Sequence, residues 1–302
     1  MKIVVTGGTG FIGRALVNEL SAHGHEMVVL TRNPHEGSTP LVRFRQWDAV
    51  SAGAWQDEVS SADAVVNLAG EPIAEGRWTA SRKRLLIESR VQATRRVVDA
   101  LGARSASPPI LISGSGIGYY GSSDDRVLVE TSPLGEGFLA ELSAAWEEEA
   151  LRATKFGTRV VLLRTGMVLE QDGGALPRML LPFRLFAGGP IPPGTQWVSW
   201  IHRRDLIGIV QWAILTSTLS GAVNAVAPEA VTMKVFCDRI GKVLDRPSWL
   251  PVPKLALDLA LGELGSVMTT GQRVQPTKAI AGGYTFRYPT LMEALQTIMA
   301  RA

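Results

Sequence analysis

The chain has 302 residues, of which 46% are hydrophobic and 20% are charged, and its formal net charge is +3. This composition is ordinary for a globular protein, and the length permits one large domain or a domain with a smaller lobe. A net charge so close to zero argues against a nucleic-acid partner, and no apolar run approaches the length of a membrane span. We therefore expect no nucleic acid and no membrane as partners.

The single cysteine, Cys237, cannot form a disulfide within the chain and lies among apolar residues of an expected helix. We interpret it as a core residue rather than a nucleophile. No signal or transit segment precedes the first expected strand, which starts at residue 2. These features predict a cytoplasmic protein in a reducing compartment, and we expect no metal site.

The stretch "VVTGGTGFIG" places Gly7, Gly10 and Gly13 between a β-branched run at 2–5 and an amphipathic segment at 11–22. Glycines between a strand and a helix permit a tight turn and a close approach of the backbone to a ligand. The free N–H groups at the start of the helix favour a phosphate. A glycine-rich turn without a ligand is the alternative, and the strand–turn–helix context makes it the weaker one.

Further apolar runs alternate with helix-length segments along the first half of the chain. Such alternation predicts an α/β fold with a doubly wound parallel sheet, whose ligands bind outside the carboxyl ends of the strands. The expected strands lie at 27–30, 64–68, 110–113 and 160–163, and the long helices at 78–101 and 136–154.

The alternation loosens after residue 168, where proline and glycine cluster in "FAGGPIPPGTQ". We predict a dinucleotide-binding Rossmann domain from residues 1–168 and about 198–228. A smaller C-terminal lobe for the substrate is then built from about 169–197 and 229–302.

The second strand ends in "LTRN", where dinucleotide folds often carry an acidic residue that binds the ribose and favours NAD. Here Arg32 stands beside Thr31, and a guanidinium suits a phosphate. The pattern predicts NADP(H), with Arg32 on the 2′-phosphate; a surface arginine is the alternative. After the fourth strand, the small residues of "NLAGE" let the backbone of 68–70 pass close to the cofactor (Leu68, Ala69 and Gly70).

With the preceding threonine, "TGGTGFIG" resembles the cofactor loop of extended short-chain dehydrogenases/reductases, a superfamily that includes sugar-nucleotide epimerases and dehydratases. The resemblance implies further cofactor contacts from this loop, from an aspartate at the adenine ring, from "ESRV" in the fourth helix, from the fifth strand and from "LLRTGMVL" at the nicotinamide end. These residues are Thr9, Phe11, Ile12, Asp48, Arg90, Ser113 and Val168.

The Tyr-x-x-x-Lys pair that normally handles the substrate proton in this superfamily is absent. None of the four tyrosines is followed four residues later by a lysine. The loop after the fifth strand, "LISGSGIGYYG", leaves Ser115, Tyr119 and Tyr120 as candidate catalytic residues. A tyrosine without a nearby cation is a reluctant base at neutral pH, because its ordinary pKa is about 10.

Several longer blocks resemble one atypical branch of the superfamily, often labelled epimerase family proteins or cell-division-inhibitor homologues and including family 39U. They include "LAGEPIAEGRW", "ELSAAWEEEA", "GGPIPPGTQWVSWIHRRDL" and "GQRVQPTKAIAGGYTFRYP". The resemblance covers essentially the whole chain. It implies NADP(H) binding, the extended fold and a characteristic C-terminal domain, but no particular substrate.

Aromatic and polar residues among glycines in the second lobe suggest a substrate pocket lined by Trp200, His202 and Gln272, although the tryptophans also suit a core. Two functions fit these features. One is an NADP(H)-dependent oxidoreductase or epimerase that acts on an unknown small molecule with an altered proton donor. The other is a non-catalytic NADPH sensor that signals through a protein partner. The missing Tyr-Lys pair favours the second, and the pocket residues favour the first.

Overall fold

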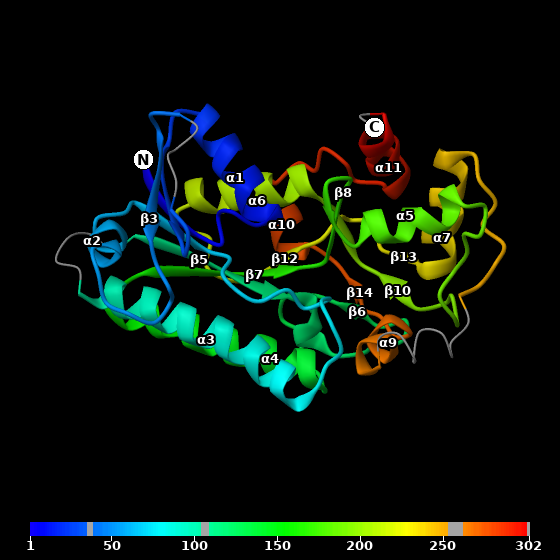
Figure 1. Cartoon of the computed structure of the whole chain (residues 1–302), viewed down its shortest axis with the longest axis horizontal. Helices are drawn as coiled ribbons and strands as arrows, with labels where there is room; N and C mark the ends of the chain where they lie inside the picture. The colour runs from blue at the N-terminus through cyan, green and yellow to red at the C-terminus, as the bar shows by residue number, and fades with distance from the viewer. Residues whose placement is uncertain (35–38, 104–108, 253–261, 301–302) are drawn as a thin grey trace.

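The computed structural model describes residues 1–34, 39–103, 109–252 and 262–300 of the chain. Seven parallel strands form its central sheet, in the order β12-β7-β5-β4-β1-β2-β3 (Figure 1). This arrangement confirms the predicted doubly wound sheet. The strands are β1 (Lys2–Thr6), β2 (Glu26–Thr31), β3 (Val42–Gln46), β4 (Ala64–Asn67), β5 (Ile110–Gly116), β7 (Arg159–Thr165) and β12 (Gly221–Ala225).

The five inner strands, from β7 to β2 in the order of the sheet, are buried on both faces, which explains their largely apolar sequences. In β1, Ile3 and Val5 face one core cluster and Val4 faces the other. Helices α1 and α6 cover the first face, and α2, α3 and α4 cover the second (Figure 1). The bounds are α1 (Phe11–Ala22), α2 (Trp55–Ser60), α3 (Ala80–Gly102), α4 (Phe138–Leu151) and α6 (Arg203–Leu215).

A third core cluster lies outside the large sheet and is built around Trp200, Phe183 and Phe236. Its helices are amphipathic, and threonine side chains cap two of them, Thr232 for α7 and Thr290 for α11. The helices of this smaller part are α5 (Leu176–Arg184), α7 (Met233–Leu244) and α11 (Leu291–Met299). Between the last two in the chain lie the short helices α9 (Glu263–Met268) and α10 (Thr277–Ala281), and α10 contacts β12 of the large sheet.

Short strand pairs connect the smaller part to the ends of the sheet. β8 pairs with both β9 and β11, β10 with β13, and β6 with β14. Their bounds are β6 (Val127–Leu128), β8 (Met167–Glu170), β9 (Gly173–Gly174), β10 (Trp197–Val198), β11 (Trp200–His202), β13 (Val231–Thr232) and β14 (Arg273–Val274). The boundary between the two predicted domains stays a prediction.

A buried carboxylate fastens the last part of the chain to α6. Asp205 accepts hydrogen bonds from the backbone N–H of Arg287 at 2.8 Å and of Tyr288 at 2.9 Å, and from the Tyr284 hydroxyl at 3.1 Å. Burial raises the pKa of Asp205 despite these donors. These hydrogen bonds hold the segment before α11 against α6.

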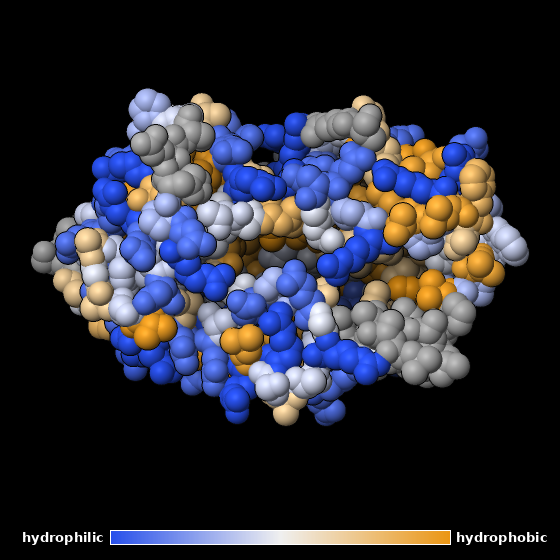
Figure 2. All heavy atoms as spheres, viewed as in Figure 1, coloured by the Kyte–Doolittle hydropathy of each residue, from blue (hydrophilic) through white to orange (hydrophobic). Residues whose placement is uncertain are grey.

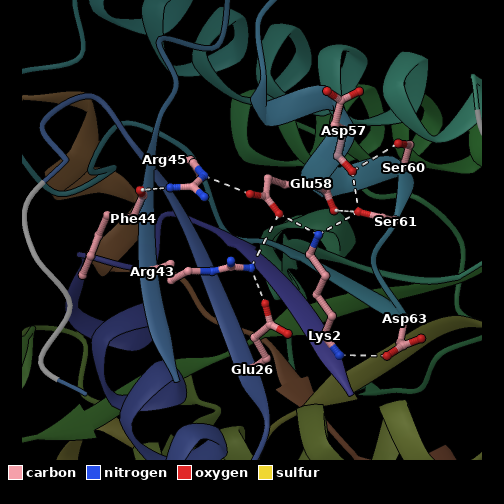
Figure 3. A network of polar contacts seen from close by, with 10 residues as sticks. All are labelled: Lys2, Glu26, Arg43, Phe44, Arg45, Asp57, Glu58, Ser60, Ser61 and Asp63. Carbon is pink, nitrogen blue, oxygen red and sulfur yellow. Dashed lines mark hydrogen bonds and ion pairs between the residues drawn. The ribbon is translucent and has the colours of Figure 1, made fainter. Parts of the chain in front are cut away.

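At the amino ends of the strands, Glu58 of α2 joins two strands in a charged network (Figure 3). Its carboxylate lies 2.6 Å from Lys2 Nζ and 2.9 Å from Arg45 Nε. Although burial opposes ionisation, these donors outweigh it and lower the pKa of Glu58. The network secures α2 against β1 and β3, on the edge of the sheet opposite the strands' carboxyl ends.

Three predicted boundaries differ from the structure, each for a local reason. The helix expected from residue 78 begins at Ala80, because the Thr79 side chain accepts a hydrogen bond from Arg82 N and caps it. The helix expected over 136–154 begins at Phe138, after Gly137 with φ +96°. The "FRQWDAV" segment also suggests a third strand that ends at Asp48, whereas β3 ends at Gln46 and Asp48 lies in the turn that follows.

Candidate functional site

The glycine-rich turn between β1 and α1 is a cradle that side chains would fill. A Cβ added to Gly7 would lie 2.7 Å from Leu68 O, and one added to Gly13 would lie 2.2 Å from Gly7 O. Gly7 also has φ +67°, which favours glycine. Gly10 is the N-cap of α1, and no side chain in the described residues caps this helix. The first N–H groups of α1 are therefore open to an anion.

The residues that follow Gly10 begin α1 and meet the turn between β8 and β9. A Cβ added to Gly173 would lie 2.5 Å from the Phe11 ring, so the hairpin packs closely over it. The Arg203 guanidinium lies 5.0 Å from the centre of the same ring. Thr9 is an exposed residue of the turn, and Ile12 packs against the apolar core beneath the sheet face.

Thr6 holds the neighbouring loop at the end of β4. Its hydroxyl donates to Asn67 Oδ1 at 2.6 Å and accepts from the N–H groups of Leu68 and Ala69, both at 3.2 Å. These bonds fix the backbone of the "NLAG" stretch beside the glycine cradle. The sequence pattern identified the small residues of this loop, and the structure adds the threonine that orders them.

Gly70 leaves a space that the Arg90 guanidinium occupies. A Cβ at Gly70 would lie 2.9 Å from Arg90 Cζ. Arg90 donates from Nη1 to Leu86 O and from Nη2 to Glu71 O, while its buried Nε has no partner among the described residues. Burial lowers the pKa of Arg90 to about 10. An unpaired donor in a buried arginine is costly unless a ligand completes it.

At the far edge of the sheet, Thr31 ends β2 and Arg32 follows as an exposed residue. Arg32 makes no ion pair or side-chain hydrogen bond with any described residue, so its guanidinium is available to a ligand. Asp48 is also exposed, and its Oδ1 accepts from the N–H groups of Val50 at 2.8 Å and Ser51 at 2.7 Å. These bonds lower the pKa of Asp48 to about 2 and give it a part in the local turn.

The carboxyl ends of β5 and β7 hold a buried polar assembly that the sequence did not reveal. Ser115 of β5 donates to Glu147 Oε1 at 2.6 Å. Arg164 of β7 donates from Nε to Glu147 Oε1 and from Nη2 to Glu147 Oε2, both at 2.8 Å. The charged side chain of Arg164 inside the apolar run "VVLLRTG" was the available signal, because a strand buried on both faces tolerates a charge only when it is paired.

Both candidate tyrosines contact this arginine. The Tyr120 hydroxyl donates to Asn224 Oδ1 at 2.6 Å and accepts from Arg164 Nη1 at 3.0 Å. Burial raises the pKa of Tyr120 even though Arg164 and Asn224 oppose the change. The Tyr119 ring stacks on the guanidinium, with Arg164 Cζ 3.4 Å from its centre. A cation is therefore near both tyrosines, but the Tyr120 proton is already held within the fold.

The other predicted residues divide between strand ends and core. Ser113 is fully buried in β5, and Val168 of β8 pairs with Ile201 of β11. Trp200 is fully buried and donates from Nε1 to Glu229 O at 2.7 Å.

His202 is fully buried as well and stacks on Tyr288 at 3.9 Å, so its surroundings, like those of Trp200, are those of packed residues. Gln272 lies beside the Tyr120 loop and donates to Gly121 O at 2.8 Å. Their role in a substrate pocket stays a prediction.

The face drawn in Figure 2 is hollowed near its centre, between the sheet on the left and the part with α5, α7 and α11 on the right, and apolar side chains lie in its depth. A separate open hollow of about 540 Å³ lies at the end of α7, around Asp238, Lys242 and Arg246. It involves none of the strand ends described above. The central hollow is therefore the one that matches the expected position of a ligand in such a sheet.

The strand-end residues fit a phosphorylated dinucleotide on three grounds: the glycine cradle, the open start of α1, and two arginines with unused donors. Within the described ranges, no group of three His, Cys, Asp or Glu side chains is arranged to hold a metal ion. Among the helices of the same ranges, none combines the length and apolar character that crossing a bilayer requires.

Comparison with known proteins gives two matching families along the chain. Residues 3–225 match the NAD dependent epimerase/dehydratase family, and residues 252–298 match a domain of unknown function, DUF1731. The second match is the distinctive C-terminal domain that the sequence blocks implied.

Similar proteins come from plants, bacteria and animals. An epimerase family protein SDR39U1 homolog, chloroplastic, from Arabidopsis thaliana is 42% identical over 99% of this chain and 87% of its own length. The epimerase family protein YfhF of Bacillus subtilis is 39% identical, over 99% of this chain and 98% of its own. A crystal structure of human epimerase family protein SDR39U1 (isoform 2) with NADPH has a TM-score of 0.87 and 34% identity, and covers 100% of both chains.

Proposed function

Because the chain belongs to the NAD dependent epimerase/dehydratase family, alongside the SDR39U1 epimerase family proteins, we propose that it binds NADP(H) and acts as an atypical oxidoreductase or epimerase. Its substrate would be a small molecule with a hydroxyl or carbonyl group. The observation that carries the proposal is the glycine cradle of Gly7 and Gly13 at the uncapped start of α1.

The chain's own residues divide the work along the strand ends. The α1 N-terminus and the backbone of 68–70 would hold the pyrophosphate and ribose, and Arg90 would donate its unused Nε nearby. Ser115 and Tyr119 would face the reacting part of the substrate at the ends of β5 and β7. When bound, the cofactor supplies the hydride, and the protein supplies binding, orientation and proton management.

Arg32 supports NADP(H) over NAD(H), because it follows β2 directly and its guanidinium has no partner among the described residues. The human relative crystallised with NADPH is consistent with this choice. A hydrogen bond to a charged group contributes about 1.5–3 kcal/mol, or roughly ten- to a hundredfold in affinity.

The test is calorimetry of NADPH and NADH binding to the wild type and to Arg32→Ala. We expect the variant to weaken NADPH by roughly ten- to a hundredfold and to leave NADH nearly unchanged. Arg84→Ala is the matched control, because Arg84 is also exposed and, among the described residues, forms an ion pair only with Glu88 four positions later. Equal losses for both cofactors would contradict the assignment of Arg32.

A non-catalytic NADPH sensor is the second candidate, favoured by the absent Tyr-Lys pair and by the internally held protons of Ser115 and Tyr120. Loss of a general acid–base group typically costs about 10²–10⁴-fold in rate. We expect slow turnover or none when NADPH oxidation is followed over a panel of common aldehydes, ketones and sugar nucleotides.

Ser115→Ala, Tyr119→Phe and Tyr120→Phe accompany the wild type in that assay. Brisk turnover by the wild type would contradict the sensor, and its loss in one variant would identify the proton donor. A protein partner is proposed only for the sensor. The cytoplasm is the proposed compartment, supported by the free, buried Cys237 and testable by cell fractionation.

A further inference from the structure

The hydroxyl proton of Ser115 is already committed to a protein acceptor. Ser115 Oγ lies 2.6 Å from Glu147 Oε1, a short, charge-assisted bond. The serine is 7% exposed at the carboxyl end of β5, and Glu147 approaches it from α4. A hydroxyl has one proton to donate and two lone pairs to accept with. Toward any ligand, Ser115 can then act only as an acceptor unless it gives up Glu147.

Arg164 keeps Glu147 from turning away. The guanidinium engages both carboxylate oxygens at 2.8 Å, and the side chains are 5% and 6% exposed. The remaining amino group of Arg164 donates to the Tyr120 hydroxyl and to Glu130 O, and Tyr119 stacks on its face. Because the arginine is held on three sides, the orientation of the carboxylate and of the serine proton is fixed before a ligand arrives.

We propose that Ser115 is a specificity-determining residue that selects a ligand presenting a hydroxyl group over one presenting a carbonyl oxygen, with Glu147 and Arg164 as its positioning residues. The proposal rests on the proposed function, because it places this ligand in the hollow beside the cofactor. A ligand O–H can donate to the free lone pair of Ser115. A carbonyl oxygen would face another acceptor, or would have to displace the bond to Glu147.

The size of the preference follows from the hydrogen bonds involved. A neutral bond between a ligand hydroxyl and Ser115 contributes roughly three- to tenfold in affinity. A carbonyl gains nothing there, because the bond it would need is already made to a charged group. Removing the serine hydroxyl is therefore expected to weaken the alcohol and to leave the ketone nearly unaffected.

The experiment uses a matched pair of fluorinated probes, 1-(4-fluorophenyl)ethanol and 4-fluoroacetophenone, titrated by ¹⁹F NMR into the full chain. The alcohol is added to protein saturated with NADPH and the ketone to protein saturated with NADP⁺, so that neither probe can react. Comparing wild type with variant for each probe cancels the difference in cofactor. Calorimetry of NADPH binding comes first, so that a failure of the proposed function is seen separately.

We expect Ser115→Ala to weaken the alcohol by roughly three- to tenfold and to change the ketone by less than about twofold. Ser143→Ala, a buried serine on the same face of α4 as Glu147, is the control and should change neither probe. In Glu147→Gln, the side-chain amide can donate to the serine oxygen, which frees the serine proton for a ketone. This variant should therefore lower the ratio of alcohol affinity to ketone affinity. A purely structural role of Glu147 would instead weaken the binding of both probes equally.

Three outcomes would overturn the proposal. One is an equal loss of both probes in Ser115→Ala, and another is a ketone that loses more affinity than the alcohol in that variant. The third is the absence of saturable alcohol binding to a wild-type protein that does bind NADPH.

Discussion

The buried pair of Glu147 and Arg164 should respond strongly to the loss of either partner. The two side chains are 6% and 5% exposed and share two hydrogen bonds of 2.8 Å. Burial disfavours the charged guanidinium, but the carboxylate outweighs it and raises the pKa of Arg164 above its ordinary value. Arg164→Met would leave Glu147 buried, with the Ser115 hydroxyl as its only donor among the described residues. We expect a loss of about 3–5 kcal/mol in the free energy of unfolding.

Removing both charges should cost less than removing the arginine alone. In the double variant Glu147→Leu with Arg164→Met, no unpaired charge remains in the low-dielectric interior. The assay is urea unfolding followed by tryptophan fluorescence for the wild type, both single variants and the double variant.

The exposed pair Arg84–Glu88 on α3 provides the control cycle, with an expected coupling of about 0.3–0.5 kcal/mol. Additive losses at Glu147 and Arg164, or a single-variant loss below about 1 kcal/mol, would refute the reasoning.

Three further predictions concern other parts of the chain. Gly13→Ala should lower thermal stability and NADPH affinity, because its Cβ would lie 2.2 Å from Gly7 O; Gly10→Ala, at 3.3 Å, should be milder in melting experiments. Glu58→Gln should lower unfolding free energy by about 1 kcal/mol at pH 7. Because the folded pKa of Glu58 is lowered, its contribution is present above about pH 4.3 and fades as pH falls, so urea unfolding near pH 3 should show a smaller difference. Burial raises the pKa of Cys237 to about 12, so iodoacetamide should label it only after unfolding.

The fold was predictable because its signals are local. The β-branched run of β1, the glycines after it and the amphipathic α1 follow one another within 22 residues. A strand buried on both faces has a continuous apolar sequence, and a turn without room for side chains has closely spaced glycines. Arg32 was singled out in the same way, because it directly follows a strand, and its contact with a cofactor stays a prediction.

The polar assembly was not predictable, because its members meet only through the topology. Ser115 and Glu147 are 32 positions apart, and Tyr120 and Asn224 are 104 apart. Residue type alone also misleads about exposure. Trp200 and His202 have the chemistry of a pocket lining, yet both are fully buried, and so is Ile201 between them, because β11 is buried on both faces.

The Glu147–Arg164 assembly also extends beyond the strand ends. Asn224, which holds the Tyr120 proton, donates to Gln275 O at 2.9 Å, and Glu130 accepts from the N–H of Lys278 at 3.1 Å. The carboxyl ends of β5, β7 and β12 are thereby joined to the C-terminal segment. A buried ion pair rarely stabilises the folded state more than well-packed apolar residues of similar volume would in the same place. Its presence in a chain without the Tyr-Lys pair is therefore better explained by what it orients, the protons of Ser115 and Tyr120, than by stability.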